Sequence, residues 1–232
     1  MALEKFSVIS TTLEHDEVNN IIKKKYKKNT ILSLSPIEIK KLIDQYIIQL
    51  QECNIQIPNV TKSYIEGEFI IYETNYCGKN IIELGFDIVN FEKFKNHILK
   101  MLNIIKKAMI NDIYFDPHPK NFVFNDKEEI CYVDFYPPYS DNLKEMTLKI
   151  SNIEHLEIIK KNYAFFKKDF LLEHFCGDFL NIDKNSDSIF KNIYSIVKEC
   201  GLVSNSHEIF IEKAKHIRSI EDLRLKKNIY LL

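Results

Sequence analysis

The sequence predicts an α+β fold in two parts, a small antiparallel β-sheet with one helix followed by a larger, mainly helical part. Strand-like runs gather in residues 1–78, where two hairpin patterns flank one strong helix pattern. Helical periodicity dominates residues 79–232 and is interrupted by one short hairpin pattern. We therefore expect an N-terminal lobe over residues 1–78 and a helical C-terminal lobe over residues 79–232.

The first hairpin is expected near the N-terminus. Residues Phe6 to Thr11 alternate weakly in polarity, and a polar turn follows from Leu13 to Glu17. A second strand-like run, Val18 to Tyr26, ends in a lysine cluster.

The helix of the N-terminal lobe has a clear start signal. Ser35 is a suitable N-cap, Pro36 suits the first helical position, and Glu38 lies three residues after the cap. Apolar residues then continue along one face to Leu50, and the pattern ends near Asn54.

A second hairpin and a linker follow this helix. Val60 to Ile65 and Glu68 to Glu73 read as strands joined by a turn at Glu66-Gly67, and a polar linker runs from Thr74 to Lys79. A long helix is then predicted with Asn90 as its cap, because apolar residues recur at three- and four-residue spacing as far as Met109.

The last part of the chain is predicted to be helical. One amphipathic stripe runs from Leu143 to Tyr163, and an aromatic run from Phe165 to Phe179 is closed by a break at Gly177. Two or three shorter helices are expected after Ser188, with Gly201 as a C-cap.

Composition limits the classes of function. The 232 residues are 45% hydrophobic and 28% charged, which is typical of a soluble globular protein, and the net charge of −1 gives no electrostatic basis for binding nucleic acid or an anionic membrane. Five cysteines without C-x-x-C spacing, no secretory signal and no long apolar run favour a cytoplasmic location. Only Arg218 and Arg224 among the 32 basic residues are arginines. The oligomeric state stays open.

One stretch carries a pattern suited to chemistry, Tyr114-Phe115-Asp116-Pro117-His118-Pro119-Lys120-Asn121. Asp134 follows thirteen residues after Asn121, directly after the apolar run 130–133. This run and residues 122–124 read as two strands joined by a polar turn. One carboxylate can orient a hydroxyl and accept its proton, while a second carboxylate and an amide oxygen can hold Mg²⁺.

These separations resemble the D-x-x-x-x-N…D-F-G arrangement of protein kinases and their relatives. His118 and Pro119 make the loop similar to the D-x-H-P-x-N loop of aminoglycoside-phosphotransferase-like small-molecule kinases, and to the D-P-H-P-G-N loop of UbiB-like atypical kinases. The resemblance implies an atypical member of the protein-kinase-like superfamily with a two-lobed fold.

The chain also departs from the kinase pattern. Tyr114 stands where a His is usual, Tyr136 replaces the Gly of D-F-G, and no glycine precedes Gly67 to form a Gly-rich loop over phosphates. Pro137 and Pro138 follow at once and no A-P-E motif is present, which argues against an activation loop switched by phosphorylation.

The resemblance assigns roles in the catalytic loop. Asp116 is implied as the catalytic base, Asn121 and Asp134 as Mg²⁺ ligands, and His118 as a residue that shapes the loop beside the nucleotide. The other histidines, His174 among them, have no spacing that suggests a cluster, so surface or satisfied core positions are expected for them.

The resemblance also implies ATP contacts in the N-terminal lobe. Lys23 is the expected phosphate-binding lysine, with Lys24 and Lys25 as open alternatives. Glu38 is the candidate carboxylate partner, although a capping role explains it equally well. Glu73 and Tyr76 are expected beside the nucleotide, because the strand and linker that carry them look like the last N-lobe strand and hinge of a kinase.

The function implied is an ATP- and Mg²⁺-dependent phosphotransferase that acts on a hydroxyl of a small molecule. A compact atypical protein kinase is the first alternative. The second is a pseudokinase that binds a nucleotide or a partner without transferring phosphate.

Overall fold

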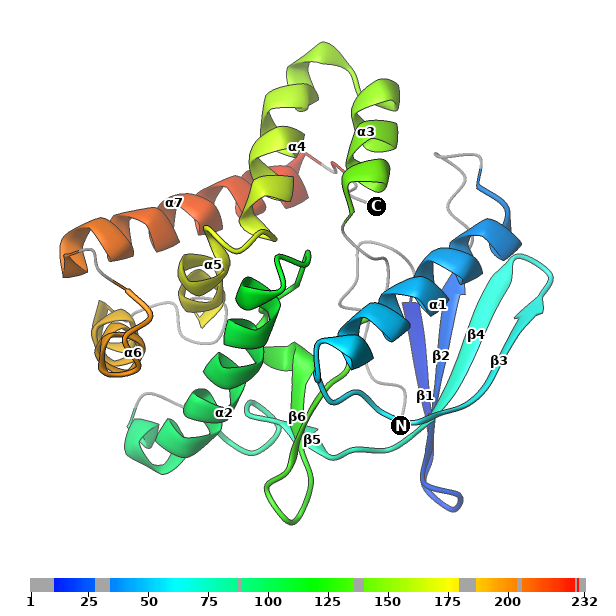
Figure 1. Ribbon diagram of the computed structural model, residues 1–232, viewed down its shortest axis with the longest axis horizontal. Coiled ribbons are helices and arrows are strands. Elements are labelled where there is room, and N and C mark those ends of the chain that lie inside the picture. Colours follow the sequence, from blue (N-terminus) through cyan, green and yellow to red (C-terminus); the bar gives the residue numbers. More distant parts are fainter. Residues whose placement is uncertain are drawn as a thin grey trace.

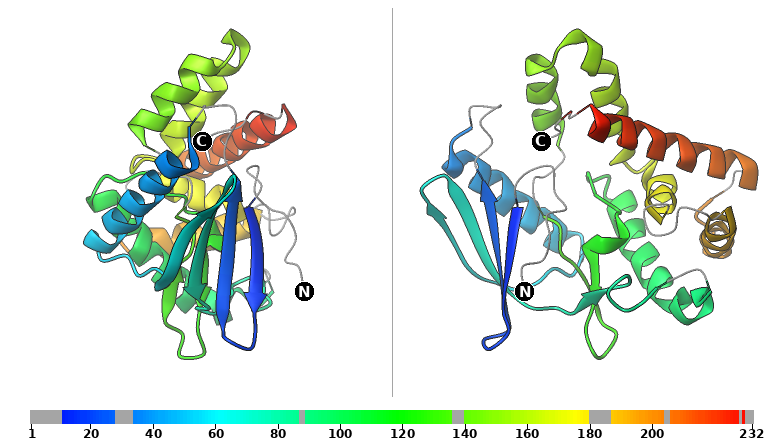
Figure 2. Two further views of the ribbon diagram at one scale, coloured as in Figure 1. Left: turned by 90° about the vertical axis from the view of Figure 1, so that its right-hand side faces the viewer. Right: turned by 180° about the vertical axis from the view of Figure 1, so that it is seen from behind.

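The computed structural model describes residues 11–27, 34–86, 89–135, 140–179, 187–203, 206–227 and 229. Within them the chain forms an α+β structure with two small antiparallel sheets and seven α-helices. The larger sheet and α1 lie on one side and most other helices lie on the other (Figure 1), which is compatible with two lobes. Figure 2 shows the same separation from behind.

The larger sheet has the strand order β1-β2-β4-β3. Its bounds are Thr11–Asp16 for β1, Ile21–Lys27 for β2, Val60–Glu66 for β3 and Phe69–Asn75 for β4, with every neighbouring pair antiparallel. The second hairpin agrees with the sequence prediction within two residues at each strand end.

The first hairpin lies further along the chain than predicted. Leu13 to Asp16, expected as a turn, belong to β1, and the turn itself spans residues 17–20. Asp16 closes this turn, because its Oδ1 accepts hydrogen bonds from the backbone amides of Val18 and Asn19 at 3.1 Å each. The strand predicted from Phe6 to Thr11 lies outside the described residues except for Thr11.

Helix α1, Pro36–Glu52, forms as the sequence predicts. Ser35 and Glu38 make a reciprocal capping box, which satisfies amide groups that a helix start would otherwise leave without partners. Its apolar face is buried at Ile39, Ile43, Tyr46, Ile47 and Leu50. The Tyr72 hydroxyl of β4 donates to Asp44 Oδ1 at 2.7 Å, which fixes the sheet to the helix.

A short segment joins the two sheets. Strand β4 ends at Asn75 and β5, Lys79–Asn80, pairs with β6, Phe122–Phe124, in a second sheet of order β5-β6-β7 with β7 at Ile130–Tyr132. Gly78 is required here, because its φ is +116° and a Cβ would lie 1.9 Å from the Phe124 carbonyl oxygen. The β6–β7 hairpin is the one predicted from sequence.

The remaining helices build the larger part of the molecule. They are α2 (Phe91–Ile110), α3 (Asp141–Ile150), α4 (Ile153–Phe165), α5 (Leu171–Asp178), α6 (Asp187–Glu199) and α7 (His207–Lys226). Gly201, with φ +67°, follows α6, and its amide donates to the Lys198 carbonyl as a C-cap would.

Two details differ from the sequence prediction. The single stripe from Leu143 to Tyr163 is divided into α3 and α4, because Asn152 caps α4 by accepting a hydrogen bond from the His155 amide. Gly177, expected as a break, is the next-to-last residue of α5, where a Cβ would be 2.8 Å from the Ala214 carbonyl oxygen of α7. The glycine therefore permits close packing of two helices.

One hydrophobic core extends across both parts. It includes Tyr72 of the sheet, Ile43 of α1, Phe94 of α2, Phe122 of β6 and Phe175 of α5. No helix among the described residues is both long enough and apolar enough to cross a membrane.

Candidate functional site

The loop from Tyr114 to Asn121 is held rigidly by its apolar residues. Phe115 is buried, stacks on Tyr132 with ring centroids 4.2 Å apart, and donates its amide proton to the Phe166 carbonyl at 2.9 Å. The Tyr46 hydroxyl of α1 donates to the Tyr114 carbonyl at 2.8 Å. The loop thus has fixed contacts with α1, β7 and the end of α4.

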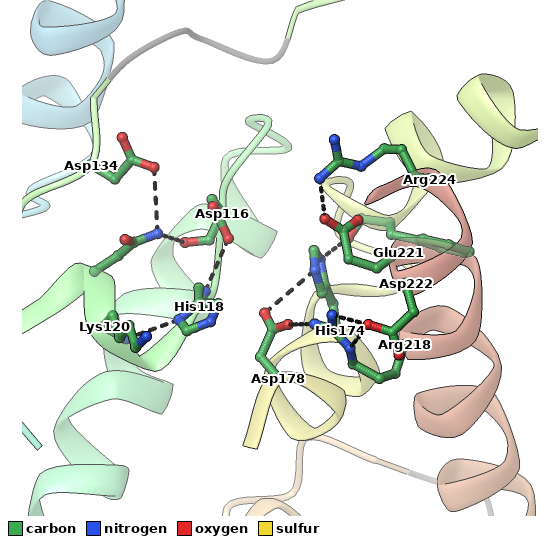
Figure 3. A network of polar contacts seen from close by, with 12 residues as sticks. Asp116, His118, Lys120, Asp134, His174, Asp178, Arg218, Glu221, Asp222 and Arg224 are labelled. Carbon is green, nitrogen blue, oxygen red and sulfur yellow. Dashed lines mark hydrogen bonds and ion pairs between the residues drawn. The ribbon is translucent and has the colours of Figure 1, made fainter. Parts of the chain in front are cut away.

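A single turn of 3-10 helix, Pro119–Asn121, brings Asn121 toward the strand that ends before Asp134. The Val133 amide donates to the Asn121 carbonyl at 2.8 Å. The Asn121 Nδ2 lies 3.5 Å from Asp134 Oδ2 and 3.4 Å from the Asp116 carbonyl oxygen. Asn121 therefore lies between Asp134 and the Asp116 backbone, and all three residues are partly buried. Figure 3 shows the positions of Asp116 and Asp134.

Asp116 lies among groups that oppose its ionisation. Burial, and then the negative charge of Asp134, raise its pKa to about 7, although His174 and the His118 amide act in the other direction. That amide donates to Asp116 Oδ1 at 3.0 Å. A carboxylate with a pKa near neutrality is suited to accepting a proton.

His118 shapes the loop from within. Its Nδ1 accepts a hydrogen bond from the Lys120 amide at 3.1 Å, which caps the 3-10 turn. Burial lowers the pKa of His118 to about 3, so the ring is neutral and can act as this acceptor.

The structure places Lys24, and not Lys23, beside Val133 and Phe135, the neighbours of Asp134. Lys24 is 8% exposed, its ammonium donates to the Val133 carbonyl, and it lies 4.6 Å from the centre of the Phe135 ring. Burial lowers its pKa to about 8, while the negative charge of Asp134 partly opposes that effect. Its ammonium therefore points to the end of β7, close to Asp134.

Lys23 lies on the opposite face of β2. Its ammonium is 5.8 Å from the centre of the Tyr64 ring, and its register partner is Glu73. Lys25 also points away and pairs with Glu14 at 2.5 Å. Successive side chains of β2 point to opposite faces of the sheet, so the position of the strand decides which lysine turns inward. The sequence alone did not determine which lysine this is.

Three other candidates are not brought to the loop. Glu38 is exposed in the capping box of α1. Glu73 accepts from the Tyr64 hydroxyl at 3.2 Å on the outer face of the sheet. Tyr76 is in the linker, where it stacks on His15 with ring centroids 4.6 Å apart.

Sequence reasoning missed two residues of α5 that approach Asp116. His174 and Asp178 lie one helical turn apart, and each offers a ligand atom within 4.8 Å of the others and of one from Asp116. Both are buried, with exposures of 4% and 3%. Their i, i+4 spacing was the only available signal, and it becomes meaningful once α5 is placed against the loop.

The two arginines of the chain support this cluster from α7. Arg218 contacts Asp178 Oδ1 at 3.3 Å and also pairs with Asp222, while Arg224 pairs with Glu221 (Figure 3). Both guanidinium groups are buried, at 9% and 7% exposure. Even so, burial raises the pKa of Asp178 to about 8, which means that its charge is incompletely compensated.

Comparisons with known proteins do not identify a relative. No protein-family model matches the chain, and no curated protein matches it significantly.

Proposed function

We propose that the chain is an ATP- and Mg²⁺-dependent phosphotransferase of the protein-kinase-like superfamily that transfers phosphate to a hydroxyl of a small molecule. The observation that carries this proposal is that Asn121 contacts both Asp134 and the Asp116 backbone, while the ammonium of Lys24 reaches the Val133 carbonyl next to Asp134. These four groups come from a loop, the end of a hairpin and a separate sheet. Their convergence is hard to explain as a set of ordinary turn residues.

The order of elements supports the same proposal. A strand that carries a buried lysine is followed by one helix, a strand pair, a short linker, a long helix and the loop with its hairpin. This order resembles that of a protein-kinase-like fold, in which we take residues 1–78 as the N-lobe and residues 79–232 as the C-lobe. Residues 76–78, which join the first sheet to the second, would then be the hinge.

The donor set fits a magnesium ion. Asp134 would supply carboxylate oxygens, and Asn121 would supply its amide oxygen after a half-turn of the amide, because its Nδ2 faces Asp134 here. Hard oxygen ligands are those that Mg²⁺ prefers. The bound ion would neutralise charge on the nucleotide phosphates. Lys24 would contact the same phosphates, and Asp116 would orient the acceptor hydroxyl and accept its proton.

A small-molecule acceptor is favoured over a protein. The His118-Pro119 pair resembles the loop of small-molecule kinases, and His118 holds that loop through its neutral ring. The sequence also has no A-P-E motif after Asp134, which favours a small-molecule acceptor as well.

A nucleotide-binding protein without turnover is the second candidate, and one observation favours it. The carboxylate expected on α1, Glu38, is engaged in the helix cap and does not reach Lys24. Kinases use an ion pair between a helix carboxylate and the phosphate-binding lysine to orient that lysine. Here the ammonium of Lys24 contacts the Val133 carbonyl instead.

Parallel assays of binding and turnover test the proposal. With Mg²⁺, ATP and a metabolite extract, wild-type protein should consume ATP, whereas Asp116→Asn should bind ATP normally and turn over at least about 100-fold more slowly. Asp134→Asn should lose Mg²⁺-dependent binding. The control Asp126→Asn changes an exposed carboxylate in the β6–β7 turn and should match wild type.

The results separate the candidates. ATP binding without turnover in wild type would favour the nucleotide-binding protein, and phosphate transferred to lysate proteins but not to metabolites would favour a protein kinase. Wild-type binding and turnover in Asp134→Asn would end the kinase interpretation.

A further inference from the structure

The cluster formed by His174, Asp178 and Asp116 has a chemistry of its own. Figure 3 shows His174 and Asp178 on α5, across from the loop that carries Asp116. The His174 Nε2 lies 3.4 Å from Asp178 Oδ2. One ligand atom from each of the three residues lies within 4.8 Å of the other two.

The orientation of His174 determines what its Nε2 can do. Its Nδ1 lies 3.1 Å from the Phe165 carbonyl oxygen, and a carbonyl can only accept, so Nδ1 carries the proton. Burial disfavours the imidazolium, which leaves a neutral ring with the Nε2 lone pair directed at Asp178. A backbone carbonyl that fixes the imidazole in this way is the usual support of a metal-binding histidine.

Asp178 also lacks a donor on the side that faces His174. Its Oδ1 contacts Arg218, but Oδ2 is buried and accepts no hydrogen bond from any described residue. Two acceptors, Nε2 and Oδ2, therefore face each other without a donor between them. A cation or a shared proton must separate them, because a buried carboxylate oxygen with no partner is costly.

The spacing favours a cation over a shared proton. The 3.4 Å between His174 Nε2 and Asp178 Oδ2 is longer than the roughly 2.7–3.2 Å usual for a hydrogen bond between nitrogen and oxygen. Ligands bound about 2.0–2.1 Å from a tetrahedral zinc ion stand roughly 3.3 Å apart. The 3.4 Å between Nε2 and Oδ2 matches that spacing.

We propose that Asp116, His174 and Asp178 bind a divalent transition-metal ion, best matched by zinc. One imidazole and two carboxylates suit this class of metal, and three protein ligands leave a position for water. The ion fixes α5 to the loop through Asp116, whose Oδ1 is already anchored by the His118 amide. This site does not include the Asn121 and Asp134 pair but shares Asp116 with the proposed phosphotransfer site. The two proposals are therefore tested by different measurements, zinc binding here and ATP turnover there.

Zinc binding to the full chain, stripped with a chelator, tests the assignment. Wild type should bind one Zn²⁺ in a titration, and X-ray absorption should show only nitrogen and oxygen neighbours at about 2.0–2.1 Å. Asp178→Asn and His174→Gln should weaken binding by at least about 10-fold, the lower end of what even an outer-shell change costs. Asp126→Asn, which changes an exposed carboxylate in the β6–β7 turn, should bind zinc as wild type does.

If Asp178→Asn and His174→Gln do not fold, Asp116→Asn provides the deciding measurement. Asp116 is only partly buried, so this variant should fold and still lose at least about 10-fold in zinc affinity. A sulfur shell at about 2.3 Å would assign the ion to cysteines such as Cys77 and Cys131 and overturn the proposal. Absence of zinc binding by wild type would also overturn it, and would leave a proton shared between His174 and Asp178.

Discussion

Replacing Lys24 with methionine should stabilise the protein while removing the proposed nucleotide binding. Lys24 is buried on the inner face of β2, and burial lowers its pKa from 10.5 to about 8. Methionine has a similar length without the charge, so it can fill the same space. A residue retained at a cost in stability is expected at a functional site.

The magnitude follows from the pKa. At pH 7 the amine is protonated in both folded and unfolded chains, so the fall from 10.5 to about 8 corresponds to about 3 kcal/mol of destabilisation. Methionine also removes the charged hydrogen bond to the Val133 carbonyl, which is worth about 1.5–3 kcal/mol. We therefore expect Lys24→Met to raise the free energy of unfolding by about 1 kcal/mol, or the Tm by about 2–4 °C.

The pH dependence has a definite sign. The pKa of Lys24 is lower in the folded chain, so the unfolded chain binds more protons between pH 8 and pH 10.5. Wild-type stability should therefore rise relative to Lys24→Met across this window, and the advantage of the variant should shrink.

Urea unfolding at pH 7 and pH 9.5, with calorimetric titration of MgATP, measures both effects. The control Lys23→Met removes an amine from the opposite face of β2 and should change stability by less than about 0.5 kcal/mol with unchanged MgATP affinity. The reasoning is refuted if Lys24→Met is destabilised by more than about 1 kcal/mol, since the lysine would then be structural. Unchanged MgATP affinity in Lys24→Met would remove it from the nucleotide site.

Two further predictions concern packing and capping. Glu38→Ala should be less stable than wild type in urea unfolding, because it removes the Glu38 half of the capping box of α1, and should leave MgATP affinity unchanged. Weaker MgATP binding would instead make Glu38 the partner of Lys24. Gly177→Ala should cost about 1–3 kcal/mol in the same measurement, because its Cβ would meet the Ala214 carbonyl at 2.8 Å, and a neutral effect would contradict the close approach of α5 and α7.

The sequence alone determined the features that depend on neighbouring residues. The start of α1 follows from Ser35, Pro36 and Glu38, and the structure confirms their capping box. The β6–β7 hairpin and the spacing of Asp116, Asn121 and Asp134 are equally local, because a tight loop and a two-strand turn fix the path between them. These signals predicted the α+β class and the central part of the candidate site.

Only the tertiary structure decided which distant residues join that site. The choice of Lys24 over Lys23 depends on strand register, since a shift of one residue turns every side chain of β2 to the other face. His174 and Asp178 approach Asp116 only because α5 packs against the loop, nearly 60 residues away in sequence. Such contacts are set by the packing of whole helices and sheets, so no local pattern in the sequence records them.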